Sequence, residues 1–283
     1  MQCAVPVMAP VTRLFMVCSM SYDTDLTDAQ WKLIRRHIPR AKSVGRPRTT
    51  NMRRVVDAIM YVVTHGCKWR GLPKDFPPWQ SVYRHFDDLQ QRGRIRRIQE
   101  ALTEMVRVEE GKAPNPSLMA IDSQSVKTGK VVPNSDKGID GGKNVRGHKR
   151  HMLVDSLGLP HEIVVTPANL HDTKGAVKVL AKYAKRVKLS RLKKLVADKG
   201  YRGEMLKGFV RKTFKARIKI GQNHTSPQRG FVPAEKRWVV ERSFSWLTNF
   251  RRLAVDQERC LRNSCAMVRL AFIRIMLRRL CPS

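Results

Sequence analysis

Apolar residues recur at the i, i+3 and i+4 spacing of amphipathic helices through the first third of the chain. Thr27 followed by Gln30 has the spacing of a capping box and begins the first predicted helix. Gly66 is a natural C-terminal stop for the second helix. The pattern predicts four helices, over residues 27–37, 51–64, 79–90 and 94–108.

The pattern changes after Pro114-Asn115-Pro116, where we place a domain boundary. Beyond it, short apolar runs predict strands over residues 118–122, 148–154, 162–166, 192–198 and 214–220. Helices are predicted over residues 172–187, 203–211, 233–250 and 263–280. The polar, glycine-containing segment 127–147 is expected to be a mobile loop. Three strands followed by alternating helices and strands is the element order of a ribonuclease-H-like domain, so we predict an α/β fold with a mixed sheet and flanking helices.

Three parts of the chain are therefore expected. Residues 1–20 are predicted to be a disordered extension, because Pro6 and Pro10 break their apolar run and no basic leader precedes it. Residues 21–113 are predicted to be an all-α domain, and residues 114–283 the α/β domain.

The charge balance says more about the partner of the protein than its length does. The 283 residues include 56 Lys and Arg against 23 Asp and Glu, a net charge of +33. Such self-repulsion is relieved by a polyanion, and nucleic acid is favoured because basic contacts release counterions from its phosphates. A membrane surface is the rival partner, but no basic amphipathic helix is evident. The six cysteines lack metal-site or disulfide spacing, which favours the reducing cytoplasm.

Three carboxylates stand out in so basic a chain. Asp122 ends the apolar run Leu-Met-Ala-Ile, Asp198 ends Leu-Val-Ala, and Glu241 follows Trp-Val-Val within a predicted helix. Each is placed against an apolar element, where burial without a partner is costly. Two carboxylates about 4 Å apart repel by roughly 4 kcal/mol, so converging acids need cations. Hard divalent ions such as Mg²⁺ prefer oxygen ligands, and two of them can support an in-line phosphoryl displacement.

Each of these acids also has an ordinary structural interpretation. Asp122 could cap a turn through Ser123, and Asp198 could pair with Lys199 or Arg202. Glu241 could form an i, i+4 interaction on a helix surface. Two further acids are assigned structural roles, Asp155 in the turn between two strands and Asp172 as a helix N-cap, with Asp172 the reserve candidate for the site.

The chain resembles bacterial insertion-sequence transposases of the DDE class, in the insertion-sequence-five family, over roughly residues 26–280. In the first part the resemblance rests on Leu-Thr-Asp-Ala-Gln-Trp, Gly-Arg-Pro-Arg, Gly-Cys-Lys-Trp-Arg, Phe-Pro-Pro-Trp and Val-Tyr-Arg-His-Phe. In the second part it rests on Ile-Asp-Ser-Gln-Ser-Val-Lys, Gly-His-Lys-Arg-His, Ala-Asn-Leu-His-Asp, Ala-Asp-Lys-Gly-Tyr and Arg-Trp-Val-Val-Glu-Arg-Ser-Phe. It implies a ribonuclease-H-like catalytic domain with Asp122, Asp198 and Glu241 at the acidic triad. Related transposases often carry a basic residue seven positions after the glutamate; here that position is Thr248, and Arg251 is the candidate replacement.

The resemblance also implies a mechanism and partners. The expected activity is DNA cleavage and strand transfer of an insertion sequence, with two Mg²⁺ ions, or Mn²⁺ in their place, held by the triad. The expected partners are double-stranded DNA, especially terminal inverted repeats and target DNA, and a second copy of the chain in a homodimer or larger synaptic complex. No membrane or small-molecule substrate is expected, and the protein is placed in the bacterial cytoplasm with the nucleoid. The alternatives are an inactive DNA-binding regulator derived from a transposase, and a metal-dependent nuclease without strand transfer.

Several basic and polar residues are candidate DNA contacts. The helical part resembles a helix-turn-helix-type module whose helix over residues 79–90 would present Gln80, Arg84 and His85 to base edges or phosphates. Arg46 and Arg48 could enter a narrow minor groove, although so short a segment favours a plain basic linker. The basic run near Asp122 could clamp the transferred strand. The remaining candidates are Lys143, Arg146, His148, Lys149, Arg150, Arg237 and Arg251.

Overall fold

The four predicted helices of the first third are present. The computed structural model describes residues 22–40, 48–187, 191–221, 224–226, 230–232 and 238–282. The capping box is formed, because the Thr27 side chain accepts from the Gln30 amide and the Gln30 side chain accepts from the Thr27 amide. Gly66 ends the second helix in the left-handed conformation, with φ 72°. The helices are α1 (Asp28–Ile34), α2 (Met52–His65), α3 (Trp79–Gln91) and α4 (Arg94–Glu109).

A mixed sheet follows, as predicted. Its strands are β1 (Leu118–Lys127), β2 (Gly138–Asp140), β3 (Val145–Asp155), β4 (Pro160–Pro167), β5 (Lys194–Ala197) and β6 (Arg217–Ile220). The order is β2-β3-β1-β5-β6, and β4 also pairs with β3. β1 is antiparallel to β3 and parallel to β5, and β5 is parallel to β6. A separate pair, β7 (His224–Ser226) and β8 (Gly230–Val232), lies between β6 and the next helix along the chain.

The prediction of a mobile loop over residues 127–147 was wrong. β1 extends to Lys127, Asn134–Asp136 form a turn of 3-10 helix, and β2 pairs with β3. Gly147 of this segment allows close packing, because a Cβ there would lie 2.1 Å from the Val126 carbonyl oxygen. Gly147 pairs with Lys127 on one side and Gly138 on the other, so it lies where three strands meet.

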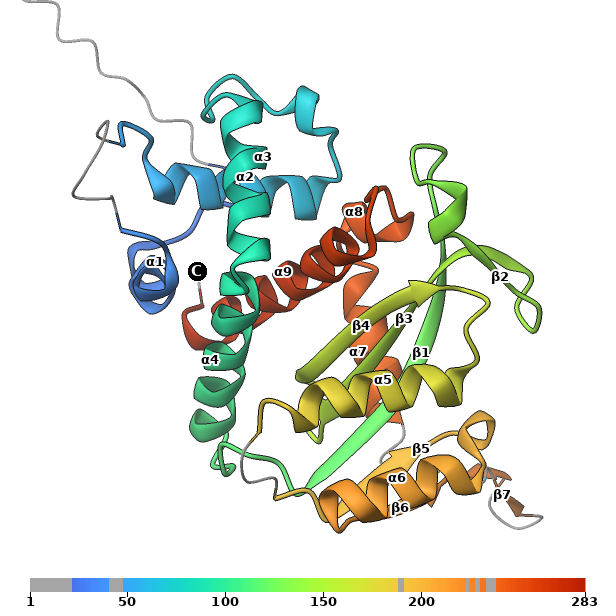
Figure 1. Cartoon of the computed structure of the whole chain (residues 1–283). Helices are drawn as coiled ribbons and strands as arrows, with labels where there is room; N and C mark the ends of the chain where they lie inside the picture. The colour runs from blue at the N-terminus through green and yellow to red at the C-terminus, as the bar shows by residue number, and fades with distance from the viewer. Residues whose placement is uncertain are drawn as a thin grey trace, which may run out of the picture.

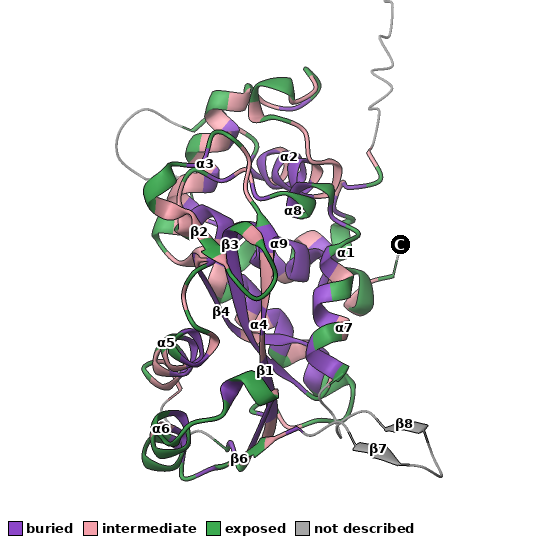
Figure 2. Cartoon of the chain, turned by 90° about the vertical axis from the view of Figure 1, so that its right-hand side faces the viewer, coloured by how far each residue is buried: buried purple, intermediate pink, exposed green. Residues whose placement is uncertain are grey.

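Helices cover both faces of the sheet (Figures 1 and 2). On one face, α5 (Asp172–Ala184) and α6 (Glu204–Phe214) pack over the β1 residues Met119 and Ile121. On the other face, α7 (Trp238–Leu247) and α9 (Leu261–Leu280) pack against Ala120 and Val196. The short α8 (Arg251–Ala254) joins these two helices. The start of the predicted helix over residues 233–250 lies outside the described residues, as does the predicted extension 1–20.

One apolar core joins the helical part to the sheet. α9 packs on α4, α2 and β4, and buried residues of α1–α4 belong to the same cluster as those of α7 and α9. Polar contacts cross the same junction. The Arg274 guanidinium donates to the Thr24 carbonyl at 2.8 Å, and the side-chain amide of Gln30 donates to the Cys281 carbonyl at 3.0 Å. Secondary structure therefore changes from helical to mixed near residue 113, where the boundary was predicted, but the apolar core is shared by the residues on both sides of it.

Candidate active site

Asp122 and Asp198 follow the same pair of residues in two neighbouring strands. β1 and β5 are parallel, and Ile121 is the register partner of Ala197. Asp122 comes directly after the first of these residues and Asp198 directly after the second, with Asp198 still extended at φ −78° and ψ 171°. The sheet therefore brings these two carboxylates from distant parts of the sequence to adjacent strands.

The two aspartates are directed to the face that α7 covers. Ile121 and Ala197 are buried in the core beneath α5 and α6, whereas Ala120 and Val196 are buried with Val240 of α7. Side chains alternate between the faces of a strand. Asp122 and Asp198 therefore share the α7 face, and both are half-buried.

Glu241 lies on α7 but is exposed, which corrects the expectation that it is placed against an apolar element. The helix buries its neighbours Val240, Ser243 and Phe244 against the sheet instead. Within the described ranges, no group of three or more His, Cys, Asp or Glu side chains is arranged to hold a metal ion. The structure thus brings Asp122 and Asp198 together and leaves Glu241 on the helix that packs over their face.

Tyr201, the last residue of the Ala-Asp-Lys-Gly-Tyr motif, is a buried neighbour of the aspartates that was not predicted as a site residue. Its hydroxyl lies beside Ser123 but makes no hydrogen bond of good geometry within the described chain. Burial raises the pKa of Tyr201 well above its usual value, and the charges of Asp122, Asp172 and Asp198 raise it further. These carboxylates therefore share one electrostatic environment around a neutral phenol.

Asp172 belongs to the same neighbourhood, with a role different from the predicted N-cap. The cap of α5 is His171, whose ring accepts from the Thr173 amide at 3.3 Å. Asp172 instead accepts a 2.7 Å hydrogen bond from the Ser123 hydroxyl, and its carboxylate lies 3.2 Å from the Lys149 ammonium. Asp172, the reserve candidate, therefore contacts Ser123, the residue that follows Asp122 in β1.

Three of the basic residues expected to clamp DNA are instead buried. Lys149 lies between Asp172 and Asp140, the latter at 3.1 Å, and also donates to the Leu170 carbonyl. His148 pairs with Asp256 through its Nδ1 at 2.9 Å, and Arg150 donates to the Leu253 carbonyl at 2.9 Å. Because all three side chains are buried and bind partners inside the protein, they are not placed to contact DNA.

The other candidate DNA contacts fall into three groups. Exposed side chains are those of Arg48, Gln80, Arg84, Lys143, Arg146 and Arg251. His85 is half-buried, and burial together with the charges of Arg84 and Arg48 lowers its pKa. Arg46 and Arg237 lie outside the described residues. Next to Arg251, Arg252 is buried and paired with Glu258 at 2.7 Å, so it does not share the exposure of its neighbour.

The turn assigned to Asp155 is confirmed. Its carboxylate accepts from the amides of Leu157 and Leu159 at 2.9 and 3.0 Å. It also pairs with Arg107 and with His161. Burial raises the pKa of Asp155, but the His161 hydrogen bond and the charges of His161 and Arg107 outweigh burial and lower it overall.

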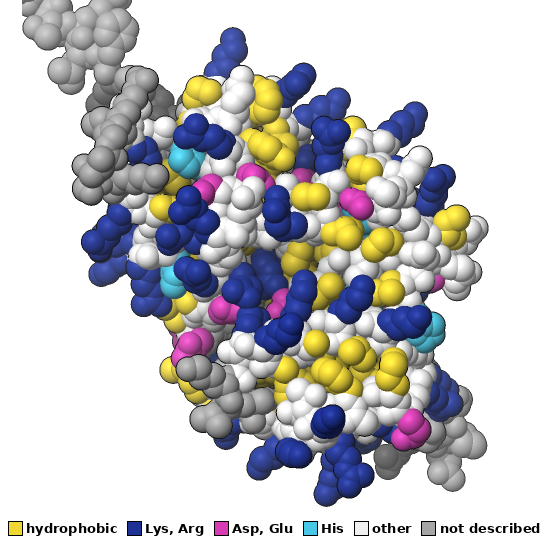
Figure 3. All heavy atoms as spheres, viewed as in Figure 1, with side chains coloured by type: hydrophobic (Ala, Val, Ile, Leu, Met, Phe, Trp, Pro, Cys, Tyr) yellow, Lys and Arg dark blue, Asp and Glu magenta, His cyan; other side chains and the backbone are white. Residues whose placement is uncertain are grey.

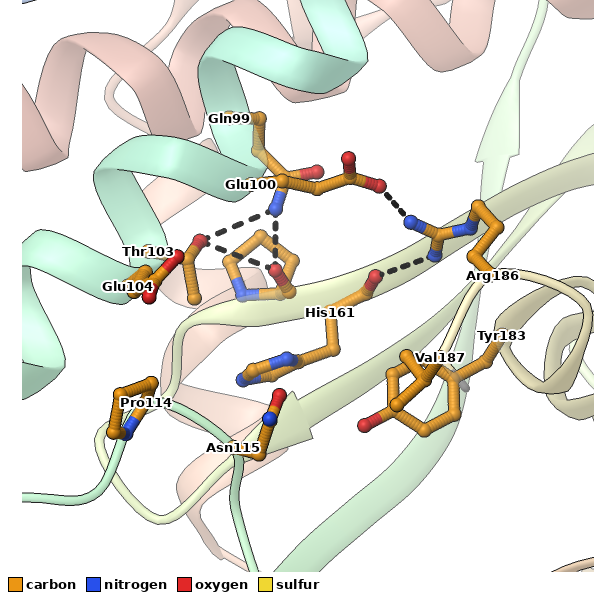
Figure 4. A pocket seen from close by; sticks show the side chains of 11 residues that line it. Gln99, Glu100, Thr103, Glu104, Pro114, Asn115, His161, Tyr183, Arg186 and Val187 are labelled. Carbon is orange, nitrogen blue, oxygen red and sulfur yellow. Dashed lines mark hydrogen bonds and ion pairs between the residues drawn. The ribbon is translucent and has the colours of Figure 1, made fainter. Parts of the chain in front are cut away.

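A cavity of about 450 Å³ lies away from the aspartates (Figure 4). It is lined from α4, from the start of β4 and from the end of α5, and His161 and Arg186 point into it. None of Asp122, Asp198 and Glu241 lines it. None of the helices in the described ranges is long and apolar enough to cross a membrane.

Two family models match the chain. Residues 113–276 match the model described as "Transposase DDE domain", and residues 26–99 match one described as "Putative transposase of IS4/5 family". The chain therefore belongs to the DDE transposase family.

Two proteins illustrate the similarity. A "Putative transposase for insertion sequence element IS6501" from Brucella ovis is 31% identical over 136 residues, which is 46% of this chain and 98% of the relative. A "Putative transposase for insertion sequence element IS402" from Burkholderia cepacia is 30% identical over 118 residues, which is 40% of this chain and 54% of that relative. Membership of this family implies that the protein acts on DNA, and DDE domains generally depend on divalent metal ions.

Proposed function

We propose that this protein is the transposase of an insertion sequence, and that it cuts DNA at the ends of the element and joins the freed ends to a target by phosphoryl transfer. The observation that carries the proposal is the position of Asp122 and Asp198 directly after the paired residues Ile121 and Ala197. Two carboxylates on adjacent strands and the same face form the start of a hard-ion site.

The residues present fit Mg²⁺, with Mn²⁺ as the alternative, because both aspartates offer oxygen ligands at one place on the sheet. When bound, two such ions would activate the attacking oxygen and stabilise the leaving one. Asp122 and Asp198 would be the principal ligands. Glu241 would supply a third carboxylate from α7, the helix that packs over the same face of β1 and β3. Its exposure leaves it accessible for this role.

The fold and the surface support the rest of the proposal. The order of the main strands and of α5, α6 and α7 is that of a ribonuclease-H-like catalytic domain. We assign the helical part to recognition of the terminal inverted repeats, with α3 as the reading helix of a helix-turn-helix-type module. Gln80 and Arg84 are exposed on the side of α3 opposite to the buried Val82 and Phe86. Lys143, Arg146 and Arg251 would contact phosphates, and two ends held together imply a homodimer or a larger synaptic complex.

The test is a Mg²⁺-dependent assay on duplex DNA that carries the terminal repeats, with Asp122→Asn and Asp198→Asn variants. Loss of one ligand should remove several kcal/mol of transition-state stabilisation, roughly a thousandfold in rate, while DNA binding persists. Asp28→Asn is the matched control, because this exposed aspartate pairs only with the surface Arg53 in the described structure.

The outcomes separate the alternatives. Cleavage followed by joining supports a transposase, nicking without joining indicates a nuclease, and binding without chemistry indicates a regulator. Full activity in either aspartate variant would overturn the assignment of the site.

A further inference from the structure

α5 carries a row of lysines on its outer face. Lys174, Lys178, Lys182 and Lys185 are all exposed, and their spacing of four, four and three residues keeps them on one side of the helix. The opposite side is buried against the sheet through residues that include Val179 and Leu180. At 1.5 Å of rise per residue, the row is about 16 Å long.

This row is unfavourable for an isolated helix. Like charges four residues apart on a helix repel and destabilise it. The only acid in α5 is Asp172 at its first position, and Asp172 already contacts Ser123 and Lys149. Among the described residues, no ion pair involves any of the four lysines. The local sequence therefore concentrates positive charge where helix stability alone would disperse it.

The row leads into a basic groove. This groove, of about 570 Å³, lies between the edge strand β4, the last turn of α5, the start of α4 and the start of α9. Figure 3 shows Lys and Arg side chains gathered around a hollow on this face of the molecule. Its basic lining residues are Arg96, Lys182, Lys185, Arg186, Arg262 and Arg269.

The arginines of the groove are paired with acids, and within the described chain its two lysines are not. Arg186 and Arg96 both contact Glu100, and Arg262 contacts Asp87, whereas no ion pair among the described residues involves Lys182 or Lys185. Glu162 is the only acid that lines the groove, and two arginines, Arg186 and Arg269, bind that one carboxylate. Burial, followed by the charges of Arg269 and Arg96, lowers the pKa of Arg186 to about 10. A phosphate on this surface would therefore act mainly on Lys182 and Lys185, the two lining cations that have no ion pair among the described residues.

We propose that the lysine row of α5 and the groove beside β4 form a track that binds the phosphate backbone of duplex DNA. The inference rests on the proposed function and extends it to a surface. One end of the track lies at the part of β1 that carries Asp122, because Asp172 at the start of α5 accepts from Ser123, the next residue of that strand, whose side chain points to the opposite face of the sheet from that of Asp122. The other end continues across Arg262 and Arg96. A duplex held along the track would thus run from this part of β1 over α5 to the edge of the sheet.

The test compares two double variants of the full chain. Lys178→Ala with Lys182→Ala removes two charges from the track. Lys207→Ala with Lys212→Ala removes two exposed charges from the neighbouring helix α6. Alanine is the strongest helix former, so both proteins should fold, which far-ultraviolet circular dichroism checks. Binding to a duplex is measured at several salt concentrations in a chelator, so that DNA is bound but not cut.

The track variant should bind at least about tenfold more weakly near 0.1 M salt, and the slope of log affinity against log salt should fall by about 2, because each phosphate contact contributes about 0.9. The α6 variant should stay within about twofold of wild type. An unchanged slope in the track variant, or an equal loss in both variants, would overturn the track. A wild-type protein that cuts and joins DNA in Mg²⁺ would still support the proposed transposase in that case. A wild-type protein that bound no duplex would overturn the proposed function as well.

Discussion

His151 is a buried basic residue whose charge the fold excludes. It is on β3, opposite Ser123 of β1, and its Nε2 lies 3.0 Å from the Thr166 hydroxyl. Burial lowers the pKa of His151 from 6.5 to about 4, and the nearby charges act in both directions, Asp172 raising it and Lys149 and Lys178 lowering it. The folded protein therefore holds a neutral imidazole next to the carboxylate neighbourhood at neutral pH.

Stability should consequently fall on acidification in a defined window. The unfolded chain takes up a proton on His151 near pH 6.5, whereas the folded chain does so only near pH 4. Between these values the unfolded state binds more protons, so the free energy of unfolding drops as the pH falls, by about 3 kcal/mol in total from this group. Below pH 4 the contribution stays constant.

Urea unfolding of wild type and His151→Gln between pH 7 and pH 4 measures this contribution. The variant should lose less stability than wild type across the window, because glutamine does not titrate. Parallel pH profiles of the two proteins would contradict the prediction. His148→Gln is not a suitable control, because His148 pairs with the buried Asp256.

At the scale of elements, the close packing of α5 on β3 requires a glycine at position 175. A Cβ on Gly175 would lie 2.1 Å from Cε1 of the His151 ring. Gly175→Ala should therefore destabilise the protein, by about 1–3 kcal/mol as for overpacking of a core, although alanine is normally favoured over glycine within a helix. The measurement is the midpoint of chemical unfolding.

Gly208 provides the matched control on α6. It is exposed, and nothing lies within 4 Å of a Cβ added there. Gly208→Ala should stabilise the protein by roughly 0.5–1 kcal/mol through helix propensity alone. A stabilising effect at both glycines would contradict the close contact between α5 and β3 at Gly175.

Local signals predicted the elements better than the contacts between them. The capping box at Thr27, the stop at Gly66 and the turn at Asp155 were readable because each depends on residues a few positions apart. The burial of His148 was not, because its partner Asp256 is 108 residues away. β2 was missed for a similar reason, since a strand of three residues has too short a pattern and is defined by its partner β3.

In the candidate site too, local patterns predicted some features, and contacts between distant residues determined the others. The apolar run before Asp198 correctly predicted the end of β5, whereas the strand end predicted at Asp122 was wrong, because β1 continues to Lys127. The register of β1 with β5 placed the two aspartates together. Tyr201 ends the motif Ala-Asp-Lys-Gly-Tyr, but its place at the site was not predicted, because one aromatic residue after a strand is consistent with ordinary core packing. The exposure of Glu241 also depends on which side of α7 packs on the sheet, with Val240 and Phe244 inward.

Over the whole molecule, buried acids hold basic residues in place and leave the surplus positive charge outside. Asp155 pairs with Arg107, Asp256 with His148, and Glu258 with Arg252. The acids in these pairs are buried, whereas the lysines of α5 are exposed. Much of the net charge of +33 therefore faces the solvent, where it can act on a polyanion.

The helical part and the sheet should unfold together, because α9 belongs to both. α9 buries Phe272 and Ile273 in the core that also contains Leu102 of α4 and Ala120 of β1. Separating residues 22–113 from the rest would expose this apolar surface, and removal of such area from water is the main stabilising contribution to folding. Thermal unfolding of the full chain should show a single cooperative transition, and a fragment over residues 22–113 should show none. Two separate transitions, or a fragment that melts cooperatively, would mean that the continuous core does not couple the two parts.

The consequence for function is that DNA bound by the helical part would be held rigidly relative to Asp122 and Asp198, since α9 leaves no flexible joint between them within the described core.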